Sequence, residues 1–321
     1  KNANVFLNGQ KAGGAPYGYI PFLVCADGLL QEGENTLQVE CDNADQPDSR
    51  WYSGAGIYRP VWRWSGPRGG IAPQGVRVPA TPIDPPAVRV EVNTEGAAPD
   101  NADYIVEILD GGQLIAEAEG MPCEIALPGA ALWSEDSPKL YTCYVTQTVD
   151  GKPFDTAQTI FGIRQITWDN KGLYINGKST LLRGGCLHHD SGILGTATYD
   201  EAEYRRVKRL KDAGFNAIRS AHNPASRSLL DACDALGVYV MDESWDMWYN
   251  HKNKYDYAGQ WRANYRADLQ AMAARDYNHP SVVMYSIGNE VSEPAQAEGV
   301  AKAREMVALL HKLDSTRPVT A

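Results

Sequence analysis

Four short apolar runs in the second half of the sequence each end in side chains that can transfer protons or bind hydroxyl groups. These polar groups are His188-His189-Asp190, Arg219 with His222 and Asn223, Asp242-Glu243, and Asn289-Glu290. Carboxylates and imidazoles are the usual general acids and bases of enzymes. If the runs are parallel strands, the four groups meet at the sheet edge where α/β enzymes place their catalytic residues. Four consecutive occurrences indicate an active site more strongly than any one residue does.

Each of these residues also has a structural interpretation. Glu290 could be the cap or the first-turn acid of a helix, and Arg219 could be an ion-pair partner of Glu243. His189 could hydrogen-bond the backbone, and His222, which precedes Asn-Pro, could anchor a loop. For Arg219 the structural and the functional roles are compatible.

The tryptophans after the third run present a similar choice. Trp245 and Trp248 could be core residues, or with Asp246 they could form a platform on which a sugar stacks. The excess of tyrosine (17) and tryptophan (8) over phenylalanine (5) fits contact with sugars, because these rings carry a polar edge.

The same residue types could also bind a metal, but their spacing argues against it. No HExxH or comparable ligand spacing links the histidines to the glutamates. The six cysteines include no CxxC pair, so free buried thiols are expected rather than a zinc site or a disulfide framework. We therefore expect no catalytic metal and no other cofactor.

Strand-like runs that alternate with helical patterns predict the sheet that would bring these residues together. The runs and the helical patterns that follow them are residues 180–187 and 200–213, 215–220 and 226–236, 238–242 and 261–277, and 281–288 and 300–313. Gly214 and Gly237 stand where helices commonly end, and residues 317–321 resemble the start of a fifth strand. Such repetition predicts βα units and a parallel sheet.

The first half of the sequence is predicted to be β-structure in two parts. The N-terminal part contains strand-like runs, including residues 57–64, and residues 66–86 have the Pro- and Gly-rich composition of a linker. Short strands then recur about every ten residues to residue 165, which predicts a β-sandwich of immunoglobulin-like size. The predicted domains are residues 1–66, 67–166 and 167–321.

The charge balance excludes two classes of partner. The 321 residues include 30 Lys and Arg against 40 Asp and Glu, a net charge of −10. Nucleic acids and anionic membranes require basic surfaces, and no run of 18 apolar residues could span a bilayer. We expect no nucleic-acid and no membrane partner.

Several motifs resemble glycoside hydrolase family 2, the family of β-galactosidases and β-glucuronidases. Its N-terminal jelly roll is similar to VFLNGQKAGGAPYGYIPF and SRWYSGAGIYRPVW, and the entry to its barrel is similar to FGIRQI. The first four strands of its (β/α)8 barrel look like LLRGGCLHHD, FNAIRSAHNPAS, VMDESWDMW and NHPSVVMYSIGNEVSE. The resemblance implies a multidomain fold: part of a jelly-roll β-sandwich, an immunoglobulin-like β-sandwich and the first half of a TIM barrel.

The resemblance also implies a retaining exo-β-glycosidase, most similar to bacterial β-galactosidases. Glu290 would be the catalytic acid/base, which protonates the leaving oxygen and then deprotonates water. Asn289 would hold the 2-hydroxyl group of the sugar. The other residues implied to contact or orient the substrate are His188, Asp190, His222, Arg219, Trp248 and Arg50, with Glu243 and Asp242 as structural support.

The sequence departs from the family pattern in three places. The loop after Glu243 lacks the Glu and His that bind magnesium in large β-galactosidases, so no magnesium is expected. A jelly-roll position that carries Asp in the family is Arg50 here. The family's nucleophile is a Glu on strand seven, whereas this chain reaches strand five. We expect a piece of a longer enzyme that lacks the start of the jelly roll and the second half of the barrel, and that is inactive alone.

The sequence leaves alternatives open. A β-glucuronidase or another family 2 glycosidase is one, and a non-catalytic carbohydrate-binding or scaffold protein is another. A carbohydrate is the expected partner in each case, and a homo-oligomer is possible.

Overall fold

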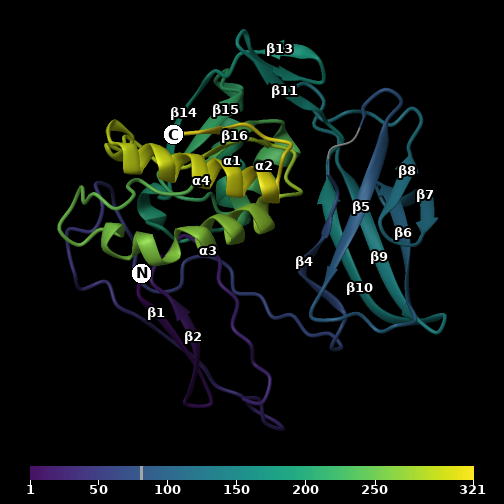
Figure 1. Ribbon diagram of the computed structural model, residues 1–321, viewed down its shortest axis with the longest axis horizontal. Coiled ribbons are helices and arrows are strands. Elements are labelled where there is room, and N and C mark those ends of the chain that lie inside the picture. Colours follow the sequence, from purple (N-terminus) through teal and green to yellow (C-terminus); the bar gives the residue numbers. More distant parts are fainter. Residues whose placement is uncertain (80–81) are drawn as a thin grey trace.

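The computed structural model describes residues 1–79 and 82–321 and divides into three successive parts (Figure 1). An N-terminal β part lies against a βα part, and a β-sandwich stands to one side of both. Residues 80 and 81, within the predicted linker, lie outside the described residues.

The N-terminal part contains one small antiparallel sheet. Its strands, in the order β2-β1-β3, are β1 (Ala3–Leu7), β2 (Gln10–Ala15) and β3 (Leu37–Cys41). Asn8 and Gly9 have φ of 51° and 77°, which is the two-residue turn that an Asn-Gly pair favours in a hairpin.

The predicted strand at residues 57–64 is wrong. The run is irregular in the structure, and Val61 and Trp62 are 63% and 59% exposed. Alternation of apolar residues predicts a strand only when a partner strand is available. Among the described residues no strand pairs with this run, and Pro60 lacks a backbone N–H.

The sandwich packs a three-stranded sheet, β4-β5-β8, against a four-stranded sheet, β10-β9-β6-β7. Its strands are β4 (Ile71–Arg77), β5 (Ala87–Thr94), β6 (Ala102–Asp110), β7 (Gln113–Glu119), β8 (Cys123–Ala126), β9 (Tyr141–Val149) and β10 (Lys152–Phe161). Side chains alternate along them, so that Val90, Val106, Ile108 and Val145 are fully buried in one core.

β4 corrects the expectation that residues 66–86 are only a linker. Pro73 and Gly75 conceal this strand in the sequence because both residues weaken strands. The structure accommodates them because β4 is an edge strand whose pairing with β5 shifts register between Ile71 and Val76.

A small antiparallel sheet that the sequence reasoning missed connects the sandwich to the βα part. Its strands are β11 (Ile166–Asp169), β12 (Gly172–Ile175) and β13 (Lys178–Thr180). Asn176-Gly177, with φ of 52° and 75°, forms the turn between β12 and β13, and this pair was the available signal.

The βα part is a parallel sheet of five strands, as the sequence predicts for the start of a barrel. Its strands, in sheet order, are β14 (Gly184–His188), β15 (Ala217–Ala221), β16 (Tyr239–Glu243), β17 (Val282–Ser286) and β18 (Val319–Thr320). Its helices are η1 (Gly192–Leu194), α1 (Asp200–Asp212), α2 (Arg227–Leu236), α3 (Ala258–Asp276), η2 (Glu293–Ala295) and α4 (Ala297–Leu313).

Local signals explain where these helices begin and end. The Ser226 hydroxyl accepts a hydrogen bond from the Leu229 N–H at the start of α2, and Gly237 ends it with φ of 69°. In α1, Val207 is fully buried as expected, whereas Tyr204, predicted on the same face, is 45% exposed. Among the helices described, none is both long and apolar enough to cross a bilayer.

Candidate active site

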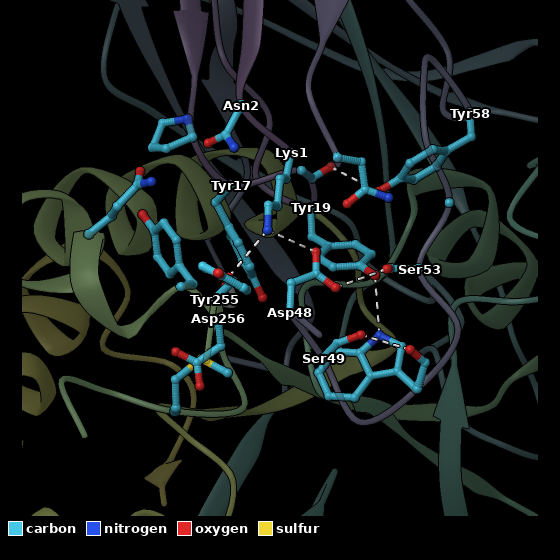
Figure 2. A pocket seen from close by; sticks show the side chains of 18 residues that line it. Lys1, Asn2, Tyr17, Tyr19, Asp48, Ser49, Ser53, Tyr58, Tyr255 and Asp256 are labelled. Carbon is cyan, nitrogen blue, oxygen red and sulfur yellow. Dashed lines mark hydrogen bonds and ion pairs between the residues drawn. The ribbon is translucent and has the colours of Figure 1, made fainter. Parts of the chain in front are cut away.

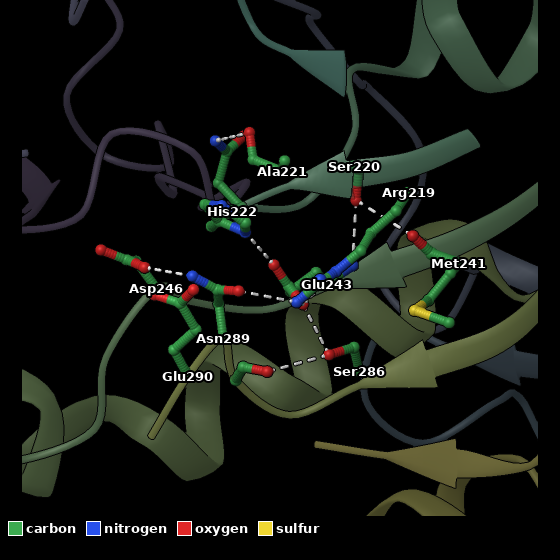
Figure 3. A network of polar contacts seen from close by, with 12 residues as sticks. Arg219, Ser220, Ala221, His222, Met241, Glu243, Asp246, Ser286, Asn289 and Glu290 are labelled. Atoms are coloured by element: carbon green, nitrogen blue, oxygen red, sulfur yellow. Dashed lines mark hydrogen bonds and ion pairs between the residues drawn. The ribbon is translucent and has the colours of Figure 1, made fainter. Parts of the chain in front are cut away.

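Several of the polar residues predicted at the strand ends lie together at one edge of the parallel sheet, as Figure 3 shows for Arg219, His222, Glu243, Asn289 and Glu290. β14 ends at His188, β15 is followed by His222, and β16 ends at Glu243. Asn289 and Glu290 follow β17 by three and four residues. Parallel pairing of β14 to β17 brings these ends together.

Glu243 is the centre of this cluster. It is fully buried, and its Oε2 accepts hydrogen bonds from Arg219 Nε at 2.9 Å and from Ser286 Oγ at 2.7 Å. Its Oε1 lies 2.6 Å from His222 Nδ1. A carboxylate here accepts from an Nδ1–H group, which leaves Nε2 of His222 available for a ligand. These partners offset the cost of burying the charge.

Asn289 is held in one orientation by its neighbours. It is 4% exposed; its Oδ1 accepts from Arg219 Nη2 at 2.9 Å and its Nδ2 donates to Asp246 Oδ1 at 2.7 Å. Because the carbonyl and amide ends have different partners, the side chain cannot flip without losing both bonds. One amide hydrogen stays available for a substrate hydroxyl group.

Glu290 differs from its neighbour in exposure. Its side chain is 69% exposed, and its Oε2 accepts from Arg50 Nη1 at 3.1 Å. Its φ of 46° is in the left-handed region, which costs a non-glycine residue roughly 1–2 kcal/mol. Non-glycine residues in such conformations are concentrated at functional sites. Glu290 is therefore the accessible carboxylate of the cluster.

Asp246 connects the N-terminal part to this edge of the sheet. It is 1% exposed, and its Oδ1 accepts from Arg50 Nη2 at 2.8 Å and from Lys252 Nζ at 3.0 Å. Lys252 Nζ also donates to the backbone oxygen of Asn289 at 2.5 Å. Burial favours a higher pKa for Asp246, but the hydrogen bonds from Arg50, Asn289 and Lys252 outweigh it and hold the pKa below its ordinary value.

Two residues at or beside this cluster, Lys252 and Trp51, were not predicted from the sequence. Lys252 was not singled out, although it lies in the same loop as Asp246. Trp51 was missed too: its ring centroid lies 5.4 Å from that of His188 and 5.7 Å from that of His222. Its position directly after Arg50 was the only local signal.

His188 is the least satisfied polar group of the cluster. Its Nδ1 is buried and has no hydrogen-bond partner among the described residues. Burial and the neighbouring His222 lower the pKa of His188, while the Asp190 carboxylate acts in the opposite direction. A neutral imidazole can bind a sugar hydroxyl group through a ring nitrogen that a ligand can reach, which for His188 is Nε2 and not the buried Nδ1. His189 instead lies 3.1 Å from the Thr198 hydroxyl group and is buried.

The expectation that Trp248 stacks on a sugar is wrong. Trp248 is fully buried, its indole N–H donates to the Ile287 backbone oxygen at 2.5 Å, and its ring stacks on Trp261. Trp245 is fully buried as well, so the core interpretation holds for both tryptophans. Their closeness to polar residues in the sequence does not determine which way the rings point.

Asp242 has no exposed surface through which it could contact a substrate. It is fully buried, and its Oδ1 accepts from Ser220 Oγ at 3.1 Å and from the Ala225 N–H at 2.9 Å. Burial, together with the charge of Asp276, raises the pKa of Asp242 well above its ordinary value. These contacts are those of a residue that supports the strand ends.

A cavity of about 70 Å³ lies beside the cluster, between the N-terminal part and the loop after β16. Figure 2 shows tyrosines from both sides, including Tyr17, Tyr19 and Tyr255, around an ion pair of 3.3 Å between Lys1 and Asp48. Trp51 lines this cavity and donates its indole N–H to the Tyr19 hydroxyl group at 3.2 Å.

One group of potential metal ligands is present among the described residues, and it lies elsewhere. Asp231, Asp234 and His279 have ligand atoms within 4.8 Å of one another. His279 Nδ1 lies 2.6 Å from Asp234 Oδ2, and Asp234 Oδ1 accepts from the Ser281 N–H at 3.0 Å. These contacts explain the group as a structural His–Asp pair.

Comparison with known proteins gives consistent matches over the whole chain. Residues 83–164 match the sequence model described as "Glycosyl hydrolases family 2", and residues 166–321 match "Glycosyl hydrolases family 2, TIM barrel domain". β-Galactosidase BoGH2A of Bacteroides ovatus is 35% identical over 100% of this chain and 43% of its own length. A β-glucuronidase of Bacteroides fragilis is 29% identical over 99% of this chain and 50% of its own length.

A solved structure gives the same result. A β-glycosidase from Bacteroides vulgatus superposes with a TM-score of 0.91 and 33% identity, over 100% of this chain and 42% of that one. The chain therefore spans half or less of the length of these relatives. Because two sequence models of one family match almost all of residues 83–321, the chain belongs to glycosyl hydrolase family 2.

Proposed function

We propose that this chain is the acid/base-bearing part of a retaining exo-β-glycosidase that hydrolyses terminal β-D-galactosides. The observation that carries the proposal is the pairing of an exposed carboxyl group, Glu290, with a fixed amide, Asn289, at the carboxyl edge of the parallel sheet. That edge is where enzymes with parallel βα barrels bind substrate.

In this proposal Glu290 transfers the proton. Its carboxyl group protonates the glycosidic oxygen as the bond to the anomeric carbon breaks, and its carboxylate then removes a proton from water. The free amide hydrogen of Asn289 binds the 2-hydroxyl group, a contact that strengthens in the oxocarbenium-like transition state. His188 and His222 bind further hydroxyl groups through their Nε2 atoms, because Nδ1 of His188 is buried and Nδ1 of His222 contacts Glu243. Arg219 fixes Glu243 and Asn289 in place.

The retaining mechanism needs a second carboxylate about 5–5.5 Å from the first. Glu243 is unsuited to attack the sugar, because it is fully buried and its oxygens are occupied by Arg219, His222 and Ser286. The five parallel strands described here are fewer than the eight of a closed barrel. We propose that the nucleophile belongs to the same protein outside these 321 residues.

The domain organisation is part of the proposal. The hairpin and the loop that carries Arg50 would belong to a jelly-roll domain within residues 1–66. The seven-stranded sandwich would be an immunoglobulin-like domain within residues 67–166. Two sheets of three and four antiparallel strands support the second assignment.

The choice of sugar rests on similarity. The relative from Bacteroides ovatus is named a β-galactosidase and is 35% identical over the whole chain. The relative from Bacteroides fragilis is named a β-glucuronidase and is 29% identical over almost the same span. A β-glucuronide is therefore the second candidate substrate.

The test uses the whole protein that contains this chain. Wild-type enzyme is expected to release nitrophenol from p-nitrophenyl β-D-galactoside, and Glu290→Gln is expected to slow this by about 10²- to 10⁴-fold, the usual contribution of a general acid/base. Glu298→Gln is the matched control, because the Glu298 side chain is 59% exposed and pairs with Arg262 on the surface. The control is expected to match wild type.

The outcomes separate the alternatives. Unchanged turnover by Glu290→Gln would overturn the acid/base assignment. Hydrolysis of the β-glucuronide in preference to the galactoside would overturn the choice of sugar but not the reaction. Sugar binding with no hydrolysis of either substrate by wild type would favour a non-catalytic carbohydrate-binding protein.

A further inference from the structure

We propose that Arg50 is a positioning residue for the acid/base carboxyl group of Glu290 rather than a ligand of the sugar. This inference rests on the proposed function, because it assigns the orientation of Glu290 to a residue 240 positions away in the sequence. It also replaces the substrate-binding role that the family resemblance implied for Arg50.

The guanidinium group of Arg50 bridges two carboxylates. Its Nη1 donates to Glu290 Oε2 at 3.1 Å, and its Nη2 donates to Asp246 Oδ1 at 2.8 Å. The guanidinium is planar and rigid, so fixing one terminal nitrogen also fixes the direction of the other. Figure 3 shows Asp246 and Glu290 on the same side of the cluster.

Asp246 is a firm anchor for this bridge. It is 1% exposed, and besides Arg50 it accepts from Lys252 Nζ and Asn289 Nδ2. A buried carboxylate held by three donors has little freedom to move. The geometry of Arg50 is therefore set by the same residue that orients Asn289, which binds the substrate in the proposed mechanism.

Glu290 needs such a partner. Its side chain is 69% exposed, and the Arg50 contact is the only hydrogen bond made by its carboxyl group within residues 1–79 and 82–321. A glutamate side chain without this bond would be free to populate several rotamers. A proton donor displaced by about 1 Å can lose roughly 100-fold in rate, so the ordering bears directly on catalysis.

The bridge also determines which oxygen carries the proton. An arginine N–H only donates, so the oxygen that it contacts must accept. Because Arg50 occupies Oε2 of Glu290, the transferable proton is held on Oε1. That proton passes to the glycosidic oxygen as the bond to the anomeric carbon breaks, which leaves Glu290 as a carboxylate. The carboxylate then takes a proton from the attacking water through the same oxygen.

The charges in the cluster argue against a sugar-binding role for Arg50. Both terminal nitrogens are engaged by protein carboxylates, and Asp246 receives a second cation from Lys252. These two bonds use two of the five N–H groups of the guanidinium and set its orientation by protein carboxylates rather than by a sugar. Removal of Arg50 should therefore affect proton transfer more than sugar binding.

Leaving groups of different acidity test this inference in the whole enzyme. Kinetic constants are measured for a 2,4-dinitrophenyl β-glycoside, whose phenolate leaves without protonation, and for an alkyl β-glycoside, which needs the acid. Arg50→Met is expected to lower kcat/KM for the alkyl glycoside by about 10- to 100-fold and for the dinitrophenyl glycoside by less than about threefold. Arg50→Lys keeps the positive charge but lacks the two terminal nitrogens of the guanidinium. We expect it to lower kcat/KM for the alkyl glycoside more than for the dinitrophenyl glycoside, as Arg50→Met does, but by a smaller factor.

The matched control is Arg68→Met, because Arg68 is an arginine of the linker region whose side chain is 95% exposed. It should behave as wild type with both substrates. Retained activity of Arg50→Met on the dinitrophenyl glycoside would itself show that the variant is folded. If Arg50→Met loses activity on both substrates, the same comparison of the alkyl and the dinitrophenyl glycoside is made with Arg50→Lys.

Equal losses on both substrates in Arg50→Lys, or no loss in either Arg50 variant, would overturn the inference. If Glu290 is not the acid/base at all, the measurement on Glu290→Gln shows it separately from the Arg50 variants. In that case Glu290→Gln itself would hydrolyse the alkyl and the dinitrophenyl glycosides as fast as wild type does.

Discussion

Single side chains at the carboxyl edge of the sheet divide into buried carboxyl groups and one exposed carboxyl group. Glu243 and Asp242 are fully buried, whereas the Glu290 side chain is 69% exposed. The strand-end residues could be found from sequence because each directly follows an apolar run. The pairing of Arg50 with Asp246 and Glu290 could not be found in this way, because Arg50 lies 196 and 240 positions from these residues and shares no local pattern with them.

Replacing Glu243 tests its supporting role. Glu243→Gln removes a buried charge and leaves Arg219 without its carboxylate partner. Arg219 is 31% exposed and keeps its bond to Asn289, so weakening the buried hydrogen bonds to Glu243 is expected to destabilise the folded state by about 1–3 kcal/mol. Denaturant unfolding of the whole protein measures this loss, with the exposed Glu201→Gln in α1 as the matched control. A loss no larger than that of the control would contradict the supporting role.

Among the elements, the βα units were the most readable part of the sequence. Their helical and strand periods are regular, so the predicted and observed ranges differ only by a few residues at their ends. β4 was missed because Pro73 and Gly75 interrupt its pattern, and residues 57–64 were wrongly predicted because alternation does not reveal whether a partner strand exists. The sheet β11-β12-β13 was missed although its Asn-Gly turn was visible.

The turn between α4 and β18 contains a buried ion pair with a definite pH dependence. Asp314 is 2% exposed and pairs with Arg317, which donates to the backbone oxygens of Val282 at 2.7 Å and His279 at 2.9 Å. Burial alone would raise the pKa of Asp314, but Arg317 and Thr316 lower it to about 2. The ionised carboxylate therefore stabilises the fold above the ordinary pKa of aspartate, and this stabilisation is lost as the pH falls towards 2.

Asp314→Asn tests this dependence. At neutral pH the variant is expected to lose about 3 kcal/mol of stability, because it leaves the Arg317 charge buried and unpaired. The difference from wild type should narrow as the pH falls from 5 to about 2.5, because in this range Asp314 of the unfolded chain takes up a proton while the folded carboxyl group, with its pKa of about 2, stays mostly ionised. Thermal unfolding at several pH values measures it, with the exposed Asp212→Asn as control. A difference that does not change with pH would exclude the ion pair as its source.

The candidate site is assembled from more than one part of the molecule. Arg50 and Trp51 come from the N-terminal part, and Arg59 of the same part donates to the Pro224 backbone oxygen after β15 at 2.9 Å. The sandwich is fixed to the βα part by Arg164, which is 3% exposed and donates to the backbone oxygens of Pro280 and Val282. Contacts of this kind depend on the assembled fold, and no single stretch of sequence predicts them.

The 321-residue chain by itself is expected not to hydrolyse β-galactosides, because the retaining mechanism requires a second carboxylate that its buried Glu243 cannot provide. The test compares the isolated chain with the whole protein on p-nitrophenyl β-D-galactoside at equal concentrations. Activity of the isolated chain comparable to that of the whole protein would mean that a residue within residues 1–321 is the nucleophile.

The product that Glu290→Ala forms from a dinitrophenyl β-glycoside in the presence of azide shows whether Glu290 is the acid/base. Removing the acid/base leaves space for a small anion that needs no proton removed, so azide should attack the covalent glycosyl-enzyme and restore turnover. We expect a β-glycosyl azide, because two displacements retain the configuration. An α-glycosyl azide would show that Glu290 is the nucleophile, and turnover that azide leaves unchanged would contradict its role as the acid/base.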